Sequence, residues 1–463
     1  MKSLPTEFLE SMKHLLGDRF NDFLNAFNQP AQKGVVFNTS LKSVNEIKDL
    51  TQLDVDNVGF SDCCFKLDNY EKCGNTWFHH AGLIYLQEPS SMVAGAVMAK
   101  ALSSVDNPLI LDMCASPGGK TIDMFLNLNG YCKIIANEII YSRAKILFSN
   151  IERLALEGID VISNKPEEIA EECGEVFDGV LVDAPCSGEG MFRKDPLTIN
   201  EWNAELPLKN QERQKAILCQ AVRCLKPGGY LVYSTCTYNL HENEEVVLYA
   251  KSQLGLNIVS VSQDIEKVTE DGFVIDNTNE LVRSRRLYIG GKLGEGQFVC
   301  LMQKPQIDTQ NTAKECEKHK KCAKIEKFYS QQLEVANRFL QDTLVNFNGY
   351  QPIVKDNIVI FVKDMPYNLN YLSFGVRVGE VINGRIEPHH QFFKTMGYLF
   401  KNQYNLTSQE VEKFLAGEEI AVDNVNSGFC SCFFRGVCLG GGKISNGRLK
   451  NYYPKGLRAK LKV

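Results

Sequence analysis

Short apolar segments alternate with longer amphipathic segments between residues 106 and 304, and this alternation constrains the fold more than any other feature. Five segments have the length and apolar content of buried strands: 109–114, 133–138, 159–163, 177–185 and 228–236. The segments between them, such as 142–158 and 208–225, have helical periodicity. Strands that alternate with helices build βαβ units and a parallel sheet. Residues 106–304 therefore predict an α/β domain, with a late antiparallel strand over 294–304 at the far end of its sheet.

The remaining chain divides around this domain. A length of 463 residues exceeds what one hydrophobic core holds, so two or three domains are expected. Residues 1–105 are predicted to be a mostly helical N-terminal extension, because apolar residues from Phe8 to Leu24 recur at helical spacing. Residues 305–325 are polar and charge-dense, which is typical of a linker. Residues 326–463 then predict a small α+β C-terminal module of one helix, short strands and glycine turns.

The charge pattern narrows the ways in which this chain can bind a nucleic acid. A net charge of -5 excludes binding through overall charge, so any contact needs a local basic patch. The last 27 residues hold seven cations and no acidic residue, with Tyr452 and Tyr453 among them. The cations are Lys443, Arg448, Lys450, Lys455, Arg458, Lys460 and Lys462. Interleaved cations and aromatic rings suit an RNA backbone with stacked bases, although a solubilising tail fits the composition equally well.

The cysteine content and the N-terminus indicate the compartment. The sixteen cysteines are scattered, the N-terminus lacks an apolar signal core, and no stretch is long enough to span a membrane. A cytoplasmic protein with reduced thiols is therefore expected. Cys316, His319 and Cys322 lie three residues apart in the linker, but a fourth ligand is missing, so no metal site is predicted.

A glycine turn follows the first strand of the α/β domain, in "DMCASPGGKT". A phosphate-binding P-loop needs a glycine five positions before Gly119, and Cys114 stands there, which disfavours an NTPase. The turn instead offers backbone amides to a ligand at the start of the next helix. Glu138 ends the second strand, where an acidic residue binds ribose hydroxyls. A ribose-bearing cofactor is thus favoured, and the pattern alone does not separate a nicotinamide dinucleotide from S-adenosylmethionine.

Two cysteines and an aspartate follow the last two predicted parallel strands. Asp183 and Cys186 come after the fourth strand, in "DAPCSG", and Cys236 ends the fifth, in "STCT". Because neighbouring parallel strands bring their carboxyl ends to one edge of the sheet, we expect all three to face the cleft beside the glycine turn. A cysteine at a strand end is usually a small buried residue. A matched pair beside a cofactor loop favours reactive thiols instead.

These motifs resemble the Sun-type RNA 5-methylcytosine methyltransferases, and most closely their bacterial RsmF-like branch. The resemblance covers nearly the whole chain, from "NTSLKS" to "GGGKISNGRLKNYYPKGLR", and "DAPCSG" with "STCT" is its most specific part. It implies a class I (Rossmann-like) S-adenosylmethionine methyltransferase core and a PUA-like C-terminal module. The implied activity is formation of 5-methylcytosine in RNA, with 16S rRNA as the expected substrate and tRNA as the alternative.

The resemblance also implies roles for individual residues. Cys236 is the implied nucleophile that adds to the cytosine ring, and Cys186 acts in product release. Asp183 lies beside the cofactor and the base, and Glu138 holds the ribose. Asn164 stands nearest to the position where the family has an aspartate that contacts adenine. The implied cofactor loop is Cys114, Ala115, Ser116, Pro117, Gly118, Gly119 and Lys120.

Three questions stay open at this stage: which cysteine is the nucleophile, whether the catalytic core is active, and whether basic residues after the motifs contact phosphates. The residues alone leave the nucleophile unassigned, because DNA cytosine methyltransferases attack from the Pro-Cys after the fourth strand. A ribosome assembly factor with a vestigial catalytic core is a further alternative, which the intact thiols and glycine turn disfavour. Basic residues after the motifs are candidate phosphate contacts or ordinary surface residues, namely Arg193, Lys194, Arg283, Arg285 and Arg286.

Overall fold

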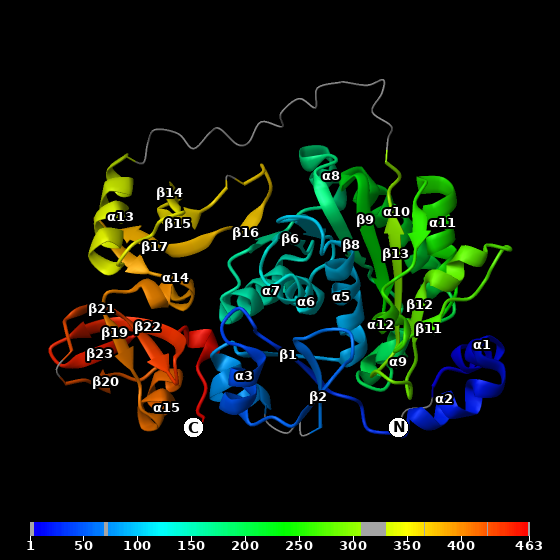
Figure 1. Cartoon of the computed structure of the whole chain (residues 1–463), viewed down its shortest axis with the longest axis horizontal. Helices are drawn as coiled ribbons and strands as arrows, with labels where there is room; N and C mark the ends of the chain where they lie inside the picture. The colour runs from blue at the N-terminus through cyan, green and yellow to red at the C-terminus, as the bar shows by residue number, and fades with distance from the viewer. Residues whose placement is uncertain (1–3, 69–72, 307–329, 365, 424, 462–463) are drawn as a thin grey trace.

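The computed structural model describes residues 4–68, 73–306, 330–364, 366–423 and 425–461 (Figure 1). Its centre is a mixed sheet with strand order β11-β12-β13-β9-β8-β5-β6-β7-β16, and β10 pairs with β13. The five predicted strands are confirmed as β5 (Leu109–Asp112), β6 (Lys133–Asn137), β7 (Ile159–Ile162), β8 (Phe177–Asp183) and β9 (Leu225–Thr235). They run parallel to one another.

The late strand of this domain is antiparallel, as predicted, but it does not lie at the end of the sheet. β13 (Gln297–Gln303) pairs with β9 on one side and with β12 on the other. The strands beyond and beside it are only two or three residues long, too short for a period-2 pattern to reveal. They are β10 (Asn257–Val259), β11 (Glu270–Asp271) and β12 (Arg285–Leu287).

Helices cover both faces of the central sheet (Figure 1). Alternate strand residues point to opposite faces, so Ile110 and Ile134 join one core and Leu111 and Ile135 the other. One core contains α5 (Met92–Ala101), α6 (Gly119–Asn127) and α7 (Tyr141–Leu154). The other contains α8 (Pro166–Cys173), α10 (Leu206–Cys224) and α11 (Glu244–Leu254). Two shorter helices are α9 (Pro196–Glu201) and α12 (Gln263–Glu266).

The N-terminal region contains the predicted helices and also a sheet that the helical periodicity did not indicate. α1 (Thr6–Leu16) packs through Phe8 against Phe192 and Trp202 of the core, and α2 (Phe20–Ala26) packs through Phe23 against Tyr238. The sheet has the order β2-β3-β1-β4. Its strands are β1 (Gly34–Phe37), β2 (Val55–Asn57), β3 (Cys64–Leu67) and β4 (Ile84–Gln87), and its helices are α3 (Val44–Thr51) and α4 (Trp77–His80).

The C-terminal module lies against the β7 edge of the core (Figure 1). One of its sheets has the order β14-β15-β17-β18, and the other has the order β19-β21-β22-β23-β20. The first region comprises α13 (Ser330–Thr343), β14 (Gln351–Lys355), β15 (Ile358–Val362), β16 (Tyr371–Ser373), β17 (Val376–Ile382), β18 (Arg385–Pro388) and α14 (His390–Met396). The second comprises β19 (Gln403–Asn405), α15 (Ser408–Ala416), β20 (Ile420–Ala421), β21 (Gly428–Phe434), β22 (Val437–Ser445) and β23 (Arg448–Asn451).

The basic C-terminal segment is folded rather than a free tail. The prediction that Tyr453 stacks on a base is wrong. Tyr453 is 2% exposed and packs against His390 and Phe414, so its ring is closed to a nucleic-acid base. Tyr452 is half-buried. The predicted linker lies outside the described residues apart from 305 and 306, and so do Cys316, His319 and Cys322. Among the helices described, none has the length and apolar character to cross a membrane.

Candidate active site

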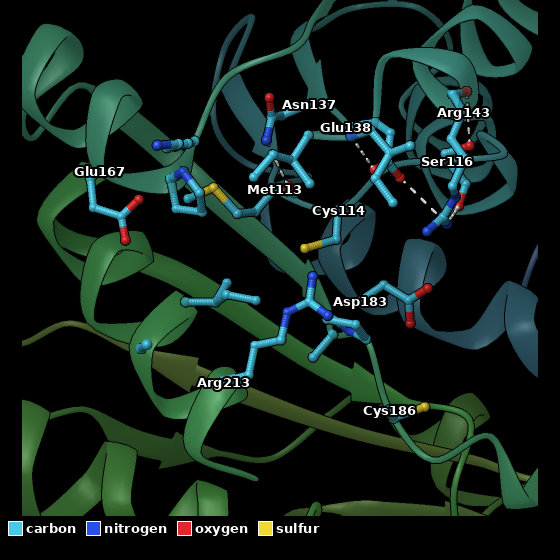
Figure 2. Close-up of a pocket in the computed structure, with 18 of the residues that line it drawn as sticks. Met113, Cys114, Ser116, Asn137, Glu138, Arg143, Glu167, Asp183, Cys186 and Arg213 are labelled. Atoms are coloured by element: carbon cyan, nitrogen blue, oxygen red, sulfur yellow. Dashed lines mark hydrogen bonds and ion pairs between the residues drawn. The ribbon is translucent and has the colours of Figure 1, made fainter. Parts of the chain in front are cut away.

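Two cavities lie at the carboxyl ends of the central strands and share one wall. The larger has a volume of about 420 Å³ and the smaller of about 270 Å³. The shared wall consists of Cys114, Ser116, Asp183 and Cys236. The larger cavity is further lined by Met113, Asn137, Glu138, Arg143, Lys165, Pro166, Glu167, Cys186 and Arg213 (Figure 2). The smaller cavity is further lined by Tyr85, Gln87, Gly119, Lys120, Lys194, Glu295 and Gln297.

The glycine turn leads from β5 into α6 beside both cavities. Gly118 has a φ of 114°, a conformation that favours glycine, and it caps the N-terminus of α6. A Cβ on Gly119 would lie 3.0 Å from the side-chain amide of Gln87, so a larger residue here would have to displace that amide. Burial raises the pKa of the Cys114 thiol well above its ordinary value, so this thiol stays protonated. Within the predicted loop, Ala115 and Pro117 line the smaller cavity only, and Gly118 shapes the turn.

Glu138 follows β6 and places a buried carboxylate on the wall of the larger cavity. It is 4% exposed, its Oε1 accepts a hydrogen bond from the Ile140 backbone N–H at 2.9 Å, and its Oε2 lies 3.4 Å from Arg143 Nη2. Figure 2 shows this carboxylate between Asn137 and Arg143. The long Glu138–Arg143 contact leaves Oε2 free to accept from a hydroxyl pair, as the sequence predicts for a ribose.

Asn164, predicted to lie nearest to the adenine, makes hydrogen bonds within the protein, and its contact with adenine stays a prediction. Its side-chain oxygen accepts a hydrogen bond from the Asn370 backbone N–H at 2.9 Å, and its side-chain nitrogen donates to Glu168 at 2.9 Å. Both ends of the amide are therefore occupied, and the residue is not part of the cavity lining. The partner Asn370 lies in a loop before β16 of the C-terminal module. A local sequence motif around Asn164 cannot indicate a partner so distant in the chain. The neighbouring Lys165 and Pro166 line the cavity instead.

The two cysteines of the predicted pair meet. Cys186 Sγ and Cys236 Sγ lie 3.3 Å apart, although the residues are 50 positions apart in the chain. Cys236 lies on the shared wall and faces both cavities, whereas Cys186 lines the larger cavity only. The sequence therefore predicted the position of both thiols correctly, and the structure adds that they are not equivalent.

A buried ion pair lies beside Cys236. Lys120 Nζ is 2.8 Å from Asp183 Oδ2, and Ser234 Oγ donates to Asp183 Oδ1 at 2.7 Å. Burial disfavours the charge on Lys120, but the ion pair with Asp183 and the nearby Cys236 sulfur raise its pKa above the ordinary value. Lys120 is thus a cation at neutral pH, in electrostatic contact with Cys236. A neighbouring cation stabilises a thiolate, which is the reactive form of cysteine.

Cys186 has a different environment. The Cys236 sulfur, burial and the carboxyl of Glu242 raise the pKa of the Cys186 thiol well above its ordinary value. Cys186 is therefore held as a neutral thiol. Figure 2 shows it on the loop that continues past Asp183.

Two buried carboxylates tie the loops that carry the thiols together. Glu242 accepts hydrogen bonds from the Ser187 backbone N–H at 2.9 Å and from side chains of Gln214 and Asn239 at 3.0 and 2.8 Å. Glu189 accepts from the Thr237 hydroxyl at 2.6 Å and from backbone N–H groups of the same loop. The donors come from both loops, so this acceptor network holds the 3.3 Å separation of the sulfurs. In the sequence, this network is indicated only by Glu189 and Glu242, which lie close to the two cysteine motifs.

The arginines considered as phosphate contacts are structural. Arg193 forms a buried ion pair with Glu295 at 2.6 Å, and Arg286 forms one with Glu244 in which both side chains are almost fully buried. Arg285 pairs with Asp271, and Arg283 donates to the Ile258 carbonyl at 2.9 Å. The side chains of Arg193, Arg285 and Arg286 are thus buried in ion pairs, which neither alternative anticipated, and Arg283 is exposed.

Sequence reasoning missed the residues outside the recognised motifs that line the smaller cavity. Tyr85 and Gln87 come from β4 of the N-terminal sheet, and Gln297 is the first residue of β13. Tyr85 and Gln87 lie in the segment "YLQEPSSM", and Gln297 lies in "GEGQF". Only the assembled fold shows that the two segments meet at one cavity.

Comparisons with known proteins agree across the chain. The family described as 16S rRNA methyltransferase RsmB/F matches residues 99–301. The N-terminal domain of 16S rRNA methyltransferase RsmF matches residues 4–89, and the methyltransferase RsmF PUA domain matches residues 401–459. The chain is 28% identical to ribosomal RNA small subunit methyltransferase F of Aliivibrio salmonicida, over 98% of this chain and 97% of that protein. It is 35% identical to the protein of the same name from Vibrio cholerae, over 59% and 60% of the two chains.

Solved structures support the same fold. A methyltransferase homolog protein from Pyrococcus horikoshii is 26% identical, with a TM-score of 0.56 over 65% of this chain and 95% of that chain. NSun6 from Pyrococcus horikoshii, solved with SFG, is 19% identical, with a TM-score of 0.56 over 65% of this chain and 99% of that chain. The second likeness concerns the fold alone.

Proposed function

We propose, on the premise that this chain belongs to the RsmF-like branch of the Sun-type RNA methyltransferases, that it forms 5-methylcytosine in 16S rRNA. The observation that carries this proposal is the unequal pair of thiols. Cys236 faces both cavities beside the Lys120 cation, and Cys186 lies 3.3 Å away as a neutral thiol. One sulfur is thus suited to attack a base and the other to work beside it.

The larger cavity fits S-adenosylmethionine. Its volume of about 420 Å³ falls within the range of about 300–1,000 Å³ that is usual for small-molecule sites. Glu138 would hold the ribose hydroxyls, Lys165 and Pro166 would border the adenine, and Cys114 and Ser116 would border the methionine end on the shared wall. Bound there, S-adenosylmethionine supplies an electrophilic methyl group.

The smaller cavity then receives the target cytosine, which a folded RNA has to release from its stack. Cys236 adds to carbon 6 of the ring, which turns carbon 5 into a nucleophile. Lys120 stabilises the thiolate before the attack. Asp183, hydrogen-bonded to Ser234 and paired with Lys120, holds a proton at the ring nitrogen and favours the addition. Cys186 assists product release, when carbon 5 loses its proton and the bond between Cys236 and carbon 6 breaks.

The C-terminal module supports an RNA partner. Its described terminal cations are exposed, and exposed cations attract a phosphate backbone. They are Lys443, Arg448, Lys450, Lys455, Arg458 and Lys460. Among the described residues the cysteines are free thiols, which fits the expected cytoplasmic location.

Bisulfite sequencing of 16S rRNA and tRNA, from cells with and without this gene, tests the proposal. We expect one cytosine of 16S rRNA to be protected from conversion only when the protein is present. A protected cytosine found only in tRNA would transfer the substrate assignment to tRNA. Identical patterns in the two cell types, together with no methyl transfer by the purified protein, would overturn the proposal.

A further inference from the structure

Most polar side chains of the smaller cavity already have partners within the protein. Lys120 and Asp183 bind each other. Glu295 is paired with Arg193, and the Glu88 carboxylate accepts from backbone N–H groups of Ser90 and Glu295 at 2.9 and 2.8 Å. These groups shape the cavity, and of them Asp183 alone has a proposed contact with the base, at the ring nitrogen.

Two glutamine atoms in the same cavity remain without a partner among the described residues. Gln297 is 2% exposed, and its Nε2 is buried without a hydrogen bond. The buried Oε1 of Gln87 is likewise unpartnered. An unsatisfied buried polar atom is energetically costly and calls for an explanation, and a ligand that completes its hydrogen bonding is one such explanation. Asp112 Oδ1 is a third such atom, on a carboxyl whose pKa burial raises to about 7.

The surrounding structure fixes what each glutamine offers. Gln87 Nε2 donates to Asp123 Oδ2 at 2.7 Å, and in this orientation the side-chain oxygen of Gln87 is the end without a partner. Gly119 lets this amide lie against the start of α6. Phe298 pairs with Thr235 in the β13–β9 ladder, so Gln297 lies opposite Cys236 at the end of that ladder. Both residues line the cavity that Cys236 faces, and one carries an unpartnered acceptor atom and the other an unpartnered donor atom.

We propose that Gln87 and Gln297 read the edge of the target base and make the site selective for cytosine. Gln87 Oε1 accepts a hydrogen bond from the 4-amino group, and Gln297 Nε2 donates one to the ring carbonyl O2. Uracil presents a carbonyl oxygen where cytosine has its amino group, and that oxygen would face the Gln87 oxygen, acceptor against acceptor. This inference rests on the proposed function, because it takes the smaller cavity as the base site.

Atom-substituted RNAs test the two contacts separately. A 16S rRNA fragment is synthesised with cytidine, 2-thiocytidine or the 2-pyrimidinone nucleoside at the cytosine that bisulfite sequencing identifies. The 2-pyrimidinone lacks the 4-amino group, and 2-thiocytidine replaces O2 by a weaker acceptor. Single-turnover methyl transfer is timed for the wild type, Gln87→Ala, Gln297→Ala and the exposed control Gln253→Ala.

The readout is the rate on cytidine RNA divided by the rate on each analogue RNA. The folded fraction of a variant cancels within this ratio, because both rates come from the same protein. Intrinsic differences in reactivity between the bases cancel when the ratio is compared between proteins. We expect the cytidine to 2-pyrimidinone ratio to fall about tenfold in Gln87→Ala and to stay unchanged in Gln297→Ala. The cytidine to 2-thiocytidine ratio should fall about threefold in Gln297→Ala only. For a variant too slow to time, the ratio of RNA dissociation constants replaces the ratio of rates.

The outcomes separate this inference from the proposed function. Unchanged ratios in both glutamine variants, with a wild type that forms 5-methylcytosine, would overturn the base-reading role alone. A change of equal size in Gln253→Ala would do the same. A wild type that forms no 5-methylcytosine on the cytidine RNA would overturn the proposed function and this inference together.

Discussion

Cys236 and Cys186 end neighbouring strands and touch through their sulfurs, yet the protein surrounds them differently. Cys236 faces both cavities and has the Lys120 cation for a neighbour. Cys186 faces one cavity and lies near the Glu242 carboxyl, which helps to keep it a neutral thiol. The comparison teaches that charges from other elements can give two matched thiols different environments, which is what the proposed division of the reaction requires.

Replacing Cys236 by alanine should have the largest effect. Because the carbon 6 adduct then cannot form, we expect methyl transfer to fall by at least about 10⁴-fold. Binding of S-adenosylmethionine, measured by calorimetry, should change less than twofold, since Glu138 and the glycine turn are untouched. Retained transfer in this variant would mean that the two thiols are not divided as described.

Replacing Cys186 by alanine should separate the first turnover from the later ones. We expect steady-state turnover to fall about 10³-fold, while methyl transfer in the first turnover stays within tenfold of the wild type. Protein that stays covalently bound to RNA should appear as a shifted band on a denaturing gel. Free turnover without such a band would contradict the product-release role.

The charge of Lys120 offers a sharper test of the asymmetry. Lys120→Met should slow transfer about 10²-fold across the pH–rate profile, because the attacking thiolate loses its neighbouring cation. In the wild type, the raised pKa keeps Lys120 charged, so no fall in rate from its deprotonation should occur below about pH 10. Lys194→Met, which removes an exposed cation from the same cavity, is the matched control. Equal profiles for the two variants would refute the special role of Lys120.

The acceptor network should give the smallest of these effects. Glu242→Gln places an amide N–H₂ among donors, so we expect about tenfold slower transfer and about 1–3 kcal/mol lower stability. Urea unfolding and single-turnover rates measure the two quantities. Glu212→Gln on the exposed side of α10 should change neither by more than about twofold. A Glu242 variant that behaves like this control would show that the network does not hold the thiols.

The sequence predicts the core well because its signals are local. The strands β5 to β9 are contiguous apolar runs, and the thiols follow them directly, so the topology of a parallel sheet brings Cys186, Cys236 and Asp183 together. The glycine turn is equally local, since Gly118 needs its left-handed conformation for the strand-to-helix turn.

The features that sequence reasoning missed depend on distant partners. The side-chain oxygen of Asn164 accepts a hydrogen bond from the backbone of Asn370, which lies 206 residues away in the chain. Tyr453 is buried by the packing of the C-terminal module. Gln87 and Gln297 reach one cavity from separate parts of the chain. No periodicity or short motif reports such contacts, because they exist only in the assembled fold.

Mapping the sulfur that bonds to RNA tests the division between the thiols most directly. The Cys186→Ala protein is incubated with 16S rRNA and S-adenosylmethionine, digested with nuclease and protease, and analysed by tandem mass spectrometry. The account predicts a methylated cytidine nucleotide attached to the peptide that contains Cys236, and no such peptide when Cys236 is also replaced by alanine. A nucleotide attached to any other cysteine would contradict it.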